Sequence, residues 1–161
     1  MEMSRTRYEH CSVVLDSCLI VIGGYVSRSR SASVISFDTQ DQNKEWKNLK
    51  SLNVAQYFHA CQEGAYEGIE GIFVTGGYHD ENSVEFYVKD IDTWMILGNM
   101  KTNRYSHTLS IVNGKLVAAG GYDSSTSMET LNGTEWIVTN ILQFGRYKHA
   151  AVNVPAGMIT C

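Results

Sequence analysis

Long apolar runs are missing from this sequence of 161 residues. Nothing in it approaches the roughly 18 uninterrupted apolar residues that a membrane-spanning helix needs, which excludes such a segment. Its opening, Met1 to Arg5, has no basic segment followed by an apolar stretch, so the sequence predicts no signal peptide. The length fits one globular domain with a real core, and we expect a soluble protein with a cytoplasmic or nuclear location.

Clusters of basic residues and paired cysteines are also missing. The formal net charge is −4, and basic residues do not gather beyond Arg28 and Arg30, so nothing indicates nucleic acid binding. The cysteines show no Cys-x-x-Cys spacing and no matching histidine pair, which argues against a zinc site. We expect all of them to be reduced, buried and apolar in character. They are Cys11, Cys18, Cys61 and Cys161.

Helical periodicity is the third absence. No extended window keeps an apolar period of about 3.6 residues, so helices are not expected. The sequence contains instead short segments rich in valine, isoleucine, phenylalanine and tyrosine, separated by glycine, asparagine, aspartate and serine. Such segments are typical of short β-strands. The sequence therefore predicts an all-β fold.

Three landmarks return in the same order along the chain, which indicates an internal repeat. An Arg-Tyr-x-His element, with Gln for Arg once, has histidines 49, 48 and 42 residues apart, at residues 7–10, 56–59, 104–107 and 146–149. A Gly-Gly-Tyr triplet closes an apolar run at residues 23–25, 76–78 and 120–122. A lone tryptophan follows at Trp46, Trp94 and Trp136. Periods of about 40 to 50 residues are typical of propellers.

One period has room for four strands that form an antiparallel meander. In the third repeat the expected strands are residues 108–112, 115–119, 128–131 and 136–139. The pair Asn113-Gly114 favours a two-residue type I′ turn between the first two, because both central positions need a positive φ. The run before each double glycine is mostly apolar, which is typical of a strand buried on both faces. The glycines that follow it allow a neighbouring sheet to approach closely.

Arg-x-x-His, an apolar strand, Gly-Gly-Tyr, a Val-Glu-like third strand and a tryptophan in the fourth strand together resemble the kelch repeat. The third-strand element is Val84-Glu85 in the second repeat and Met128-Glu129 in the third, and it drifts to Val34-Ile35 in the first. The resemblance implies kelch-type β-propeller blades, each a four-stranded antiparallel meander. The repeats cover about residues 5–53, 54–101 and 102–143, with a partial fourth repeat over about 144–161.

About three and a half blades make an incomplete ring, because propellers have about four to eight blades. We expect either a fragment of a longer kelch protein, which we favour, or self-association in which another copy closes the ring. Two departures from the kelch pattern are Gln56 in place of arginine and an insertion around residues 64–71. They affect the shapes of loops rather than the fold.

The repeated histidines allow two interpretations. Four similarly placed histidines can form a metal or catalytic cluster, but a catalytic group is needed once, whereas a structural group is needed once per blade. We therefore favour histidine and arginine side chains that bond to neighbouring backbone groups. The tryptophans are expected to fill the space between blades. No catalytic residue, metal site or cofactor is predicted.

The loops after each Gly-Gly and before each repeated histidine share one face, because the loops of a four-stranded meander alternate between its two ends. Tyrosine and arginine carry much of the binding energy at interfaces, and binding residues are common on loops of rigid scaffolds. In kelch adaptors this face is the pocket for the substrate protein, as the resemblance implies. Ordinary solvated turns and packing residues are the alternative. The predicted partner-binding residues are Tyr25, Arg28, Arg30, Tyr57, Tyr78, His79, Asp80, Asn82, Arg104, Tyr105, Tyr122, Asp123, Arg146 and Tyr147.

The resemblance implies a non-enzymatic protein–protein interaction module, similar to the substrate-binding propeller of kelch-like ubiquitin-ligase adaptors. Those adaptors also carry a BTB domain and a BACK segment, so the ubiquitin-ligase part of this expectation depends on sequence beyond these residues. One alternative is an actin-associated cytoskeletal scaffold. A propeller enzyme, such as a copper-radical oxidase or a sialic acid epimerase, is less favoured, because the repeat already accounts for most tyrosines and histidines. The expected partner is another protein, not nucleic acid or a membrane.

Overall fold

The computed structural model describes residue 3, residues 5–43 and residues 45–152. Within these ranges the chain forms strands, loops and one 3₁₀ turn, η1 (Lys89–Ile91), without any α-helix. None of the described segments is a helix with the length and hydropathy needed to cross a membrane. The predicted all-β fold is confirmed.

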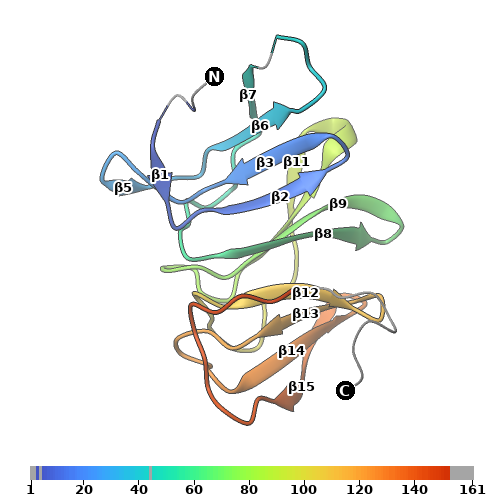
Figure 1. Cartoon of the computed structure of the whole chain (residues 1–161). Helices are drawn as coiled ribbons and strands as arrows, with labels where there is room; N and C mark the ends of the chain where they lie inside the picture. The colour runs from blue at the N-terminus through green and yellow to red at the C-terminus, as the bar shows by residue number, and fades with distance from the viewer. Residues whose placement is uncertain (1–2, 4, 44, 153–161) are drawn as a thin grey trace.

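Three four-stranded antiparallel sheets follow one another along the chain, and we call them blades 1, 2 and 3 (Figure 1). Blade 1 contains β2 (Cys11–Leu15), β3 (Cys18–Ile22), β6 (Val34–Asp38) and β7 (Trp46–Leu49). Blade 2 contains β8 (Ala60–Tyr66), β9 (Ile69–Thr75), β10 (Val84–Val88) and β11 (Thr93–Ile96). Blade 3 contains β12 (Thr108–Val112), β13 (Lys115–Ala119), β14 (Ser127–Asn132) and β15 (Glu135–Ile141). A small sheet of β1 (Arg7–Tyr8), β4 (Tyr25–Val26) and β5 (Ser29–Arg30) lies beside blade 1.

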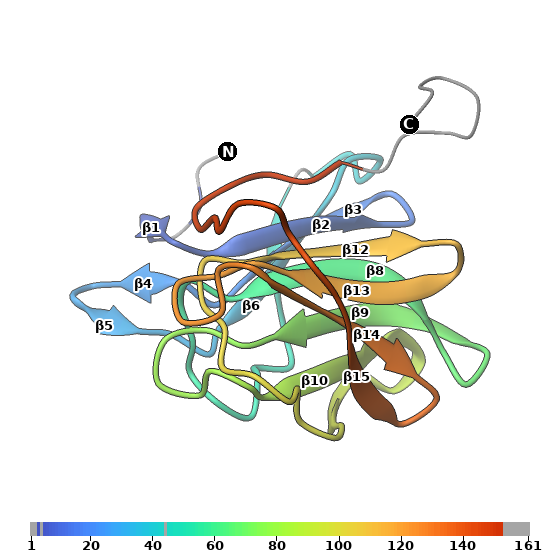
Figure 2. The ribbon, with the colours of Figure 1, turned by 90° about the horizontal axis from the view of Figure 1, so that it is seen from below.

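The blades are arranged as in a propeller, with the first strand of each on the inside. Strand β8 contacts both β2 and β12, and Figures 1 and 2 show these three strands side by side. Over the described residues the blades do not close into a ring. Of the partial fourth repeat, residues 144–152 form no strand, and residues 153–161 lie outside the described ranges.

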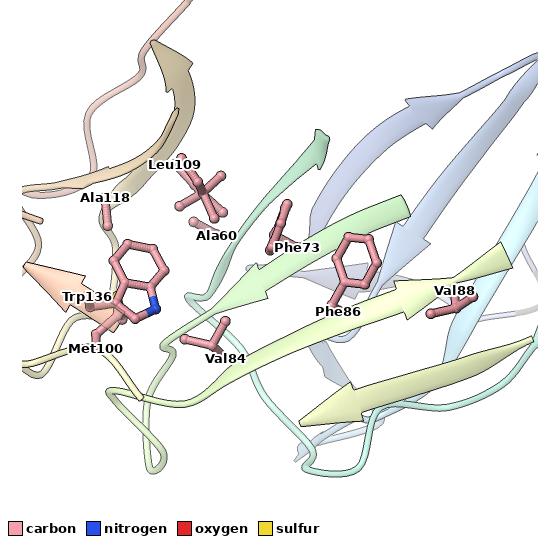
Figure 3. Packing of buried hydrophobic residues seen from close by; sticks show 10 residues of the cluster. Ala60, Phe73, Val84, Phe86, Val88, Met100, Leu109, Ala118 and Trp136 are labelled. Atoms are coloured by element: carbon pink, nitrogen blue, oxygen red, sulfur yellow. The ribbon is translucent and has the colours of Figure 1, made fainter. Parts of the chain in front are cut away.

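The core lies between the blades rather than within one. Side chains alternate along β9, so Ile72 packs toward blade 1, whereas Phe73 packs toward blade 3. Trp94 of blade 2 lies in the cluster shared with blade 1, and Trp136 of blade 3 lies in the cluster shared with blade 2, where Figure 3 shows it beside Val84. Two of the three tryptophans thus fill the space between blades, as predicted. Burial of such rings is a large apolar contribution to stability.

The third repeat follows its predicted strands closely. The structure extends the last two expected strands by one or two residues at their ends. Asn113 and Gly114 have φ values of 51° and 73°, as the type I′ turn requires. One expectation holds only in part: β3 and β9 end in fully buried runs, but burial alternates along β13. Within the described residues no further blade covers the second face of β13.

A disulfide joins two blades, which corrects the prediction that every cysteine is reduced. Cys11 of β2 and Cys61 of β8 form the bond, with their Cα atoms 5.9 Å apart. Their separation of 50 residues is about one repeat, so they occupy similar places on adjacent inner strands. The two cysteines are close in space because β2 packs against β8, which the spacing of the cysteines in the sequence does not reveal. Cys18 is a half-buried free thiol, and Cys161 lies outside the described residues.

The double glycines sit where the next blade approaches most closely. Gly76 has a φ of 57°, and a Cβ there would lie 2.3 Å from the carbonyl oxygen of Arg104 and 2.9 Å from Cε1 of His107. Gly23 and Gly120 are covered in the same way by His59 and His149. His59, His107 and His149 therefore each pack on the first glycine of the preceding blade.

The substitution Gly76→Ala should be more destabilising than Gly133→Ala by about 1 to 3 kcal/mol, the usual cost of overpacking. Gly133 is a matched control because its φ is 61° and a Cβ there would meet nothing within 4 Å. Both alanines would adopt the same left-handed backbone, so the difference isolates the contact with blade 3. Urea unfolding followed by tryptophan fluorescence measures it. Equal losses would show that the blade contact at Gly76 is unimportant.

The tyrosine arc as a candidate functional site

Two loops of each blade meet on one face of the molecule. One precedes the inner strand and carries the tyrosine of Arg-Tyr-x-His, and the other follows Gly-Gly. Backbone bonds hold them together: the amide of Tyr78 donates to the carbonyl of Tyr57, and that of Tyr122 to that of Tyr105, each at 2.9 Å. The predicted sharing of a face is therefore observed between these loops.

The tyrosines of these loops form one continuous row, which we call the tyrosine arc. Adjacent rings have centroids between 5.0 and 5.5 Å apart, within the range of favourable aromatic pairs. The two kinds of motif alternate along the row, so each complete repeat supplies two rings. In order, the arc is Tyr8, Tyr25, Tyr57, Tyr78, Tyr105, Tyr122 and Tyr147.

The arc is accessible to a partner. Tyr8, Tyr122 and Tyr147 keep more than half of their surface exposed, at 59%, 55% and 52%. The tyrosines between them are partly exposed. Single exposed aromatic side chains are common on proteins, but a contiguous exposed apolar surface usually marks an interaction site.

Most of the predicted partner-binding residues lie at or beside this arc. Six of its seven tyrosines were among them, and Tyr8 was missed although it stands in the same motif. Arg28 and Arg30 are exposed on the hairpin of β4 and β5. Burial raises the pKa of the Tyr57 hydroxyl, and the positive charge of Arg30 opposes this rise. His79 is exposed with its ring 4.6 Å from that of Tyr78. Asp80, Asn82, Asp123 and Arg146 complete the loops, all at least partly exposed.

Arg104 is not a partner-binding residue, which corrects the prediction. Its side chain is fully buried and forms an ion pair with buried Glu129 at 3.0 Å. It also donates to the carbonyl oxygens of Gly120 at 2.7 Å and Ser127 at 2.9 Å. An arginine in the repeated motif thus ties the strands of its own blade together, as Arg7 does through the carbonyls of Gly23 and Ser33.

Two of the repeated histidines bond to the preceding blade, one to a backbone carbonyl as we expected and the other to a side-chain hydroxyl. The Nε2 atom of His59 lies 3.1 Å from the carbonyl oxygen of Ile22 in blade 1, and that of His107 lies 2.8 Å from the Thr75 hydroxyl of blade 2. Burial lowers the pKa of His59 to about 4 and that of His107 to about 3, so both rings are neutral near pH 7. Among the described residues no group of three or more His, Cys, Asp or Glu side chains is placed to hold a metal ion.

One hollow lies on the opposite face and has a different character. It has a volume of about 490 Å³ and lies between blades 2 and 3, under the hairpin of β8 and β9. Those strands are longer than their counterparts in the other blades because of the insertion around residues 64–71. Its walls are glycines and apolar side chains such as Tyr66, Phe73 and Ile111. It gathers few polar groups, so the tyrosine arc is the stronger candidate for recognition.

Comparisons with known proteins agree with these repeats. The family model described as Kelch motif matches residues 6–53. Kelch-like protein 15 of Mus musculus is 28% identical over 138 residues, which cover 71% of this chain and 22% of that protein. An F-box/kelch-repeat protein of Arabidopsis thaliana is 32% identical over 123 residues, which cover 71% of this chain and 31% of that protein. The chain thus spans between about a fifth and a third of the length of these relatives.

A solved structure shares the fold. The structure of YjhT aligns with a TM-score of 0.70 at 13% identity, over 88% of this chain and 54% of that one. Blades of this form, held by repeated Arg-Tyr-x-His and Gly-Gly-Tyr elements, define part of a β-propeller with an aromatic surface along one face. The chain belongs to the kelch-repeat proteins.

Proposed function

We propose that this chain is a protein–protein interaction module that holds a partner protein on the tyrosine arc. The observation that carries the proposal is the unbroken row of seven neighbouring tyrosine rings on loops fixed by backbone bonds. Aromatic anchors on a rigid scaffold bind at a small entropic cost, because little is ordered on binding.

Within this proposal, the chain serves as the substrate-binding part of a kelch-like ubiquitin-ligase adaptor in the cytoplasm. Relatives that are kelch-like and F-box/kelch-repeat proteins support this choice by similarity alone. A cytoplasmic location would make the bond between Cys11 and Cys61 sensitive to redox conditions, because cytosolic thiols are kept reduced.

Photocrosslinking from defined positions tests the proposal. The full chain carries p-benzoylphenylalanine at Tyr122 or, as a control, at Val112, which is 49% exposed at the other end of β12. We expect a crosslinked protein from position 122 that is absent from position 112. The double substitution Tyr78→Ala and Tyr105→Ala should remove that crosslink while the circular dichroism spectrum stays unchanged.

Mass spectrometry of the crosslinked protein then separates the alternatives. A ubiquitin-ligase substrate supports the adaptor role, whereas actin would favour the cytoskeletal scaffold. The same product from both positions, or one that survives the double substitution, would contradict binding on the arc.

A further inference from the structure

Two loops of the arc bring acidic side chains together where blades 2 and 3 meet. Glu81 lies in the loop between β9 and β10, and its carbonyl accepts a bond of 2.7 Å from the amide of Arg104. Asp123 lies in the loop between β13 and β14, next to Tyr122, whose amide is bonded to Tyr105. Backbone bonds thus hold the main chain at Glu81 and beside Asp123 next to the centre of the arc.

The aromatic wall at this place is formed by three tyrosines. The rings of Tyr105 and Tyr122 are stacked, with centroids 5.0 Å apart and planes at 21°. Tyr78 meets Tyr105 edge-on at 5.4 Å and 89°. The exposed fractions of Tyr78 and Tyr122 are 39% and 55%, so ring surface faces solvent. Aromatic faces carry negative potential and attract cations within about 6 Å.

The two carboxylates make this part of the arc electronegative. Burial raises the pKa of Glu81 because it removes water from the charged carboxylate, and the like charge of the neighbouring Asp123 raises it further. Burial, Asp123 and Glu81 also raise the pKa of Tyr105. Within the described ranges neither carboxylate belongs to an ion pair. The neighbouring His79 acts in the opposite direction, because it lowers the pKa of Glu81.

Basic side chains lie toward the two ends of this face, together with the acidic Glu9 beside Tyr8. Arg28 and Arg30 lie at the blade 1 end, and Arg146 lies at the blade 3 end. Lys148 already places its ammonium 5.1 Å from the centroid of Phe58, so the aromatic side chains of these loops do accept a cation in this molecule. The pairing of Glu81 and Asp123 beside the rings of Tyr105 and Tyr122 therefore marks a place along the arc where a positive group is favoured.

We propose that Tyr78, Tyr105 and Tyr122, together with Glu81 and Asp123, form a subsite for one basic side chain of the partner, the guanidinium of an arginine or the ammonium of a lysine. This inference rests on the proposed protein-binding function and specifies the chemistry of its central contact. The cation lies on the tyrosine faces and donates hydrogen bonds to the two carboxylates, which combines a cation–π contact with charge-assisted bonds.

NMR titration of the full chain with N-acetyl-arginine methylamide tests the subsite directly. We expect saturable shifts of the Tyr105 and Tyr122 ring signals and of the Asp123 amide signal. The citrulline analogue has nearly the same shape without the charge, and it should bind at least about tenfold more weakly, as the loss of a charge-assisted bond predicts. Equal binding of both probes, or no shift at these residues, would overturn the inference.

Paired variants separate this inference from the function on which it rests. Glu81→Gln with Asp123→Asn should abolish the preference for the arginine probe, whereas Glu67→Gln, which removes an exposed carboxylate on the opposite face, should leave it intact. If the partner crosslinks equally well from position 122 in wild type and in the Glu81→Gln and Asp123→Asn variant, the basic-residue subsite is wrong and protein binding stands. If the crosslink is missing even in wild type, the proposed function itself fails.

Discussion

Replacing Arg104 with methionine should lower the free energy of unfolding by about 3 to 5 kcal/mol, the usual loss when one partner of a buried ion pair is removed. Arg104 and Glu129 both have no exposed side-chain surface, so the remaining carboxylate would be a buried charge without a cation. The carbonyls of Gly120 and Ser127 would lose their donor as well. Urea unfolding at pH 7, followed by tryptophan fluorescence, measures the loss.

Two control substitutions accompany this experiment. Arg30→Met removes an exposed arginine of the same face and should change stability by less than about 0.5 kcal/mol. Gln56→Met alters the equivalent position of blade 2, where the amide bonds only to the Ser83 hydroxyl. Glu85 is held there by Asn53 and the amide of Val54, without a cation. A loss at Arg104 no larger than that at Gln56 would contradict the importance of the ion pair.

Opening the disulfide should cost about 4 kcal/mol of stability, because the chain-entropy model gives this value for a loop of some 50 residues. The bond joins the inner strands of blades 1 and 2, so it restricts the unfolded chain between them. Cys61→Ser, or wild type with a reductant, should show this loss in urea unfolding.

The remaining free thiol provides the control for the disulfide. Cys18→Ser should unfold like wild type and keep the sensitivity to reductant, whereas Cys61→Ser should be insensitive to it. If wild type and Cys61→Ser unfold at the same urea concentration without reductant, the bond does not contribute to stability under those conditions.

The repeat made much of the fold predictable. Tryptophans, double glycines and the Asn113-Gly114 turn each have a local physical meaning, so strand order and even strand ends in the third repeat follow from the sequence. The shared face of the tyrosine loops also follows, because a meander alternates its turns. Gln56 and the insertion near residue 64 changed local contacts and strand lengths, not the architecture.

Other features depend on packing that sequence patterns do not contain. The sequence does not distinguish Arg104 from an exposed interface arginine, because only the fold places buried Glu129 beside it. The hairpin of β4 and β5 has Ser27 and Arg28 at positive φ, and neither is a glycine or asparagine that would predict a turn there. Glu81 has no motif of its own, and only the contact between blades 2 and 3 places it near Asp123. The disulfide likewise required the neighbouring positions of β2 and β8.

The alternation of the two tyrosine motifs makes the arc a modular surface. Each complete repeat adds one ring from Arg-Tyr-x-His and one from Gly-Gly-Tyr. The number of blades therefore sets the length of the partner segment that the arc can contact. Gain or loss of a repeat would lengthen or shorten the contact strip by two rings without redesign of the others. Charges in the loops, such as Glu81 and Asp123, can then vary from blade to blade and give each stretch of the strip its own preference.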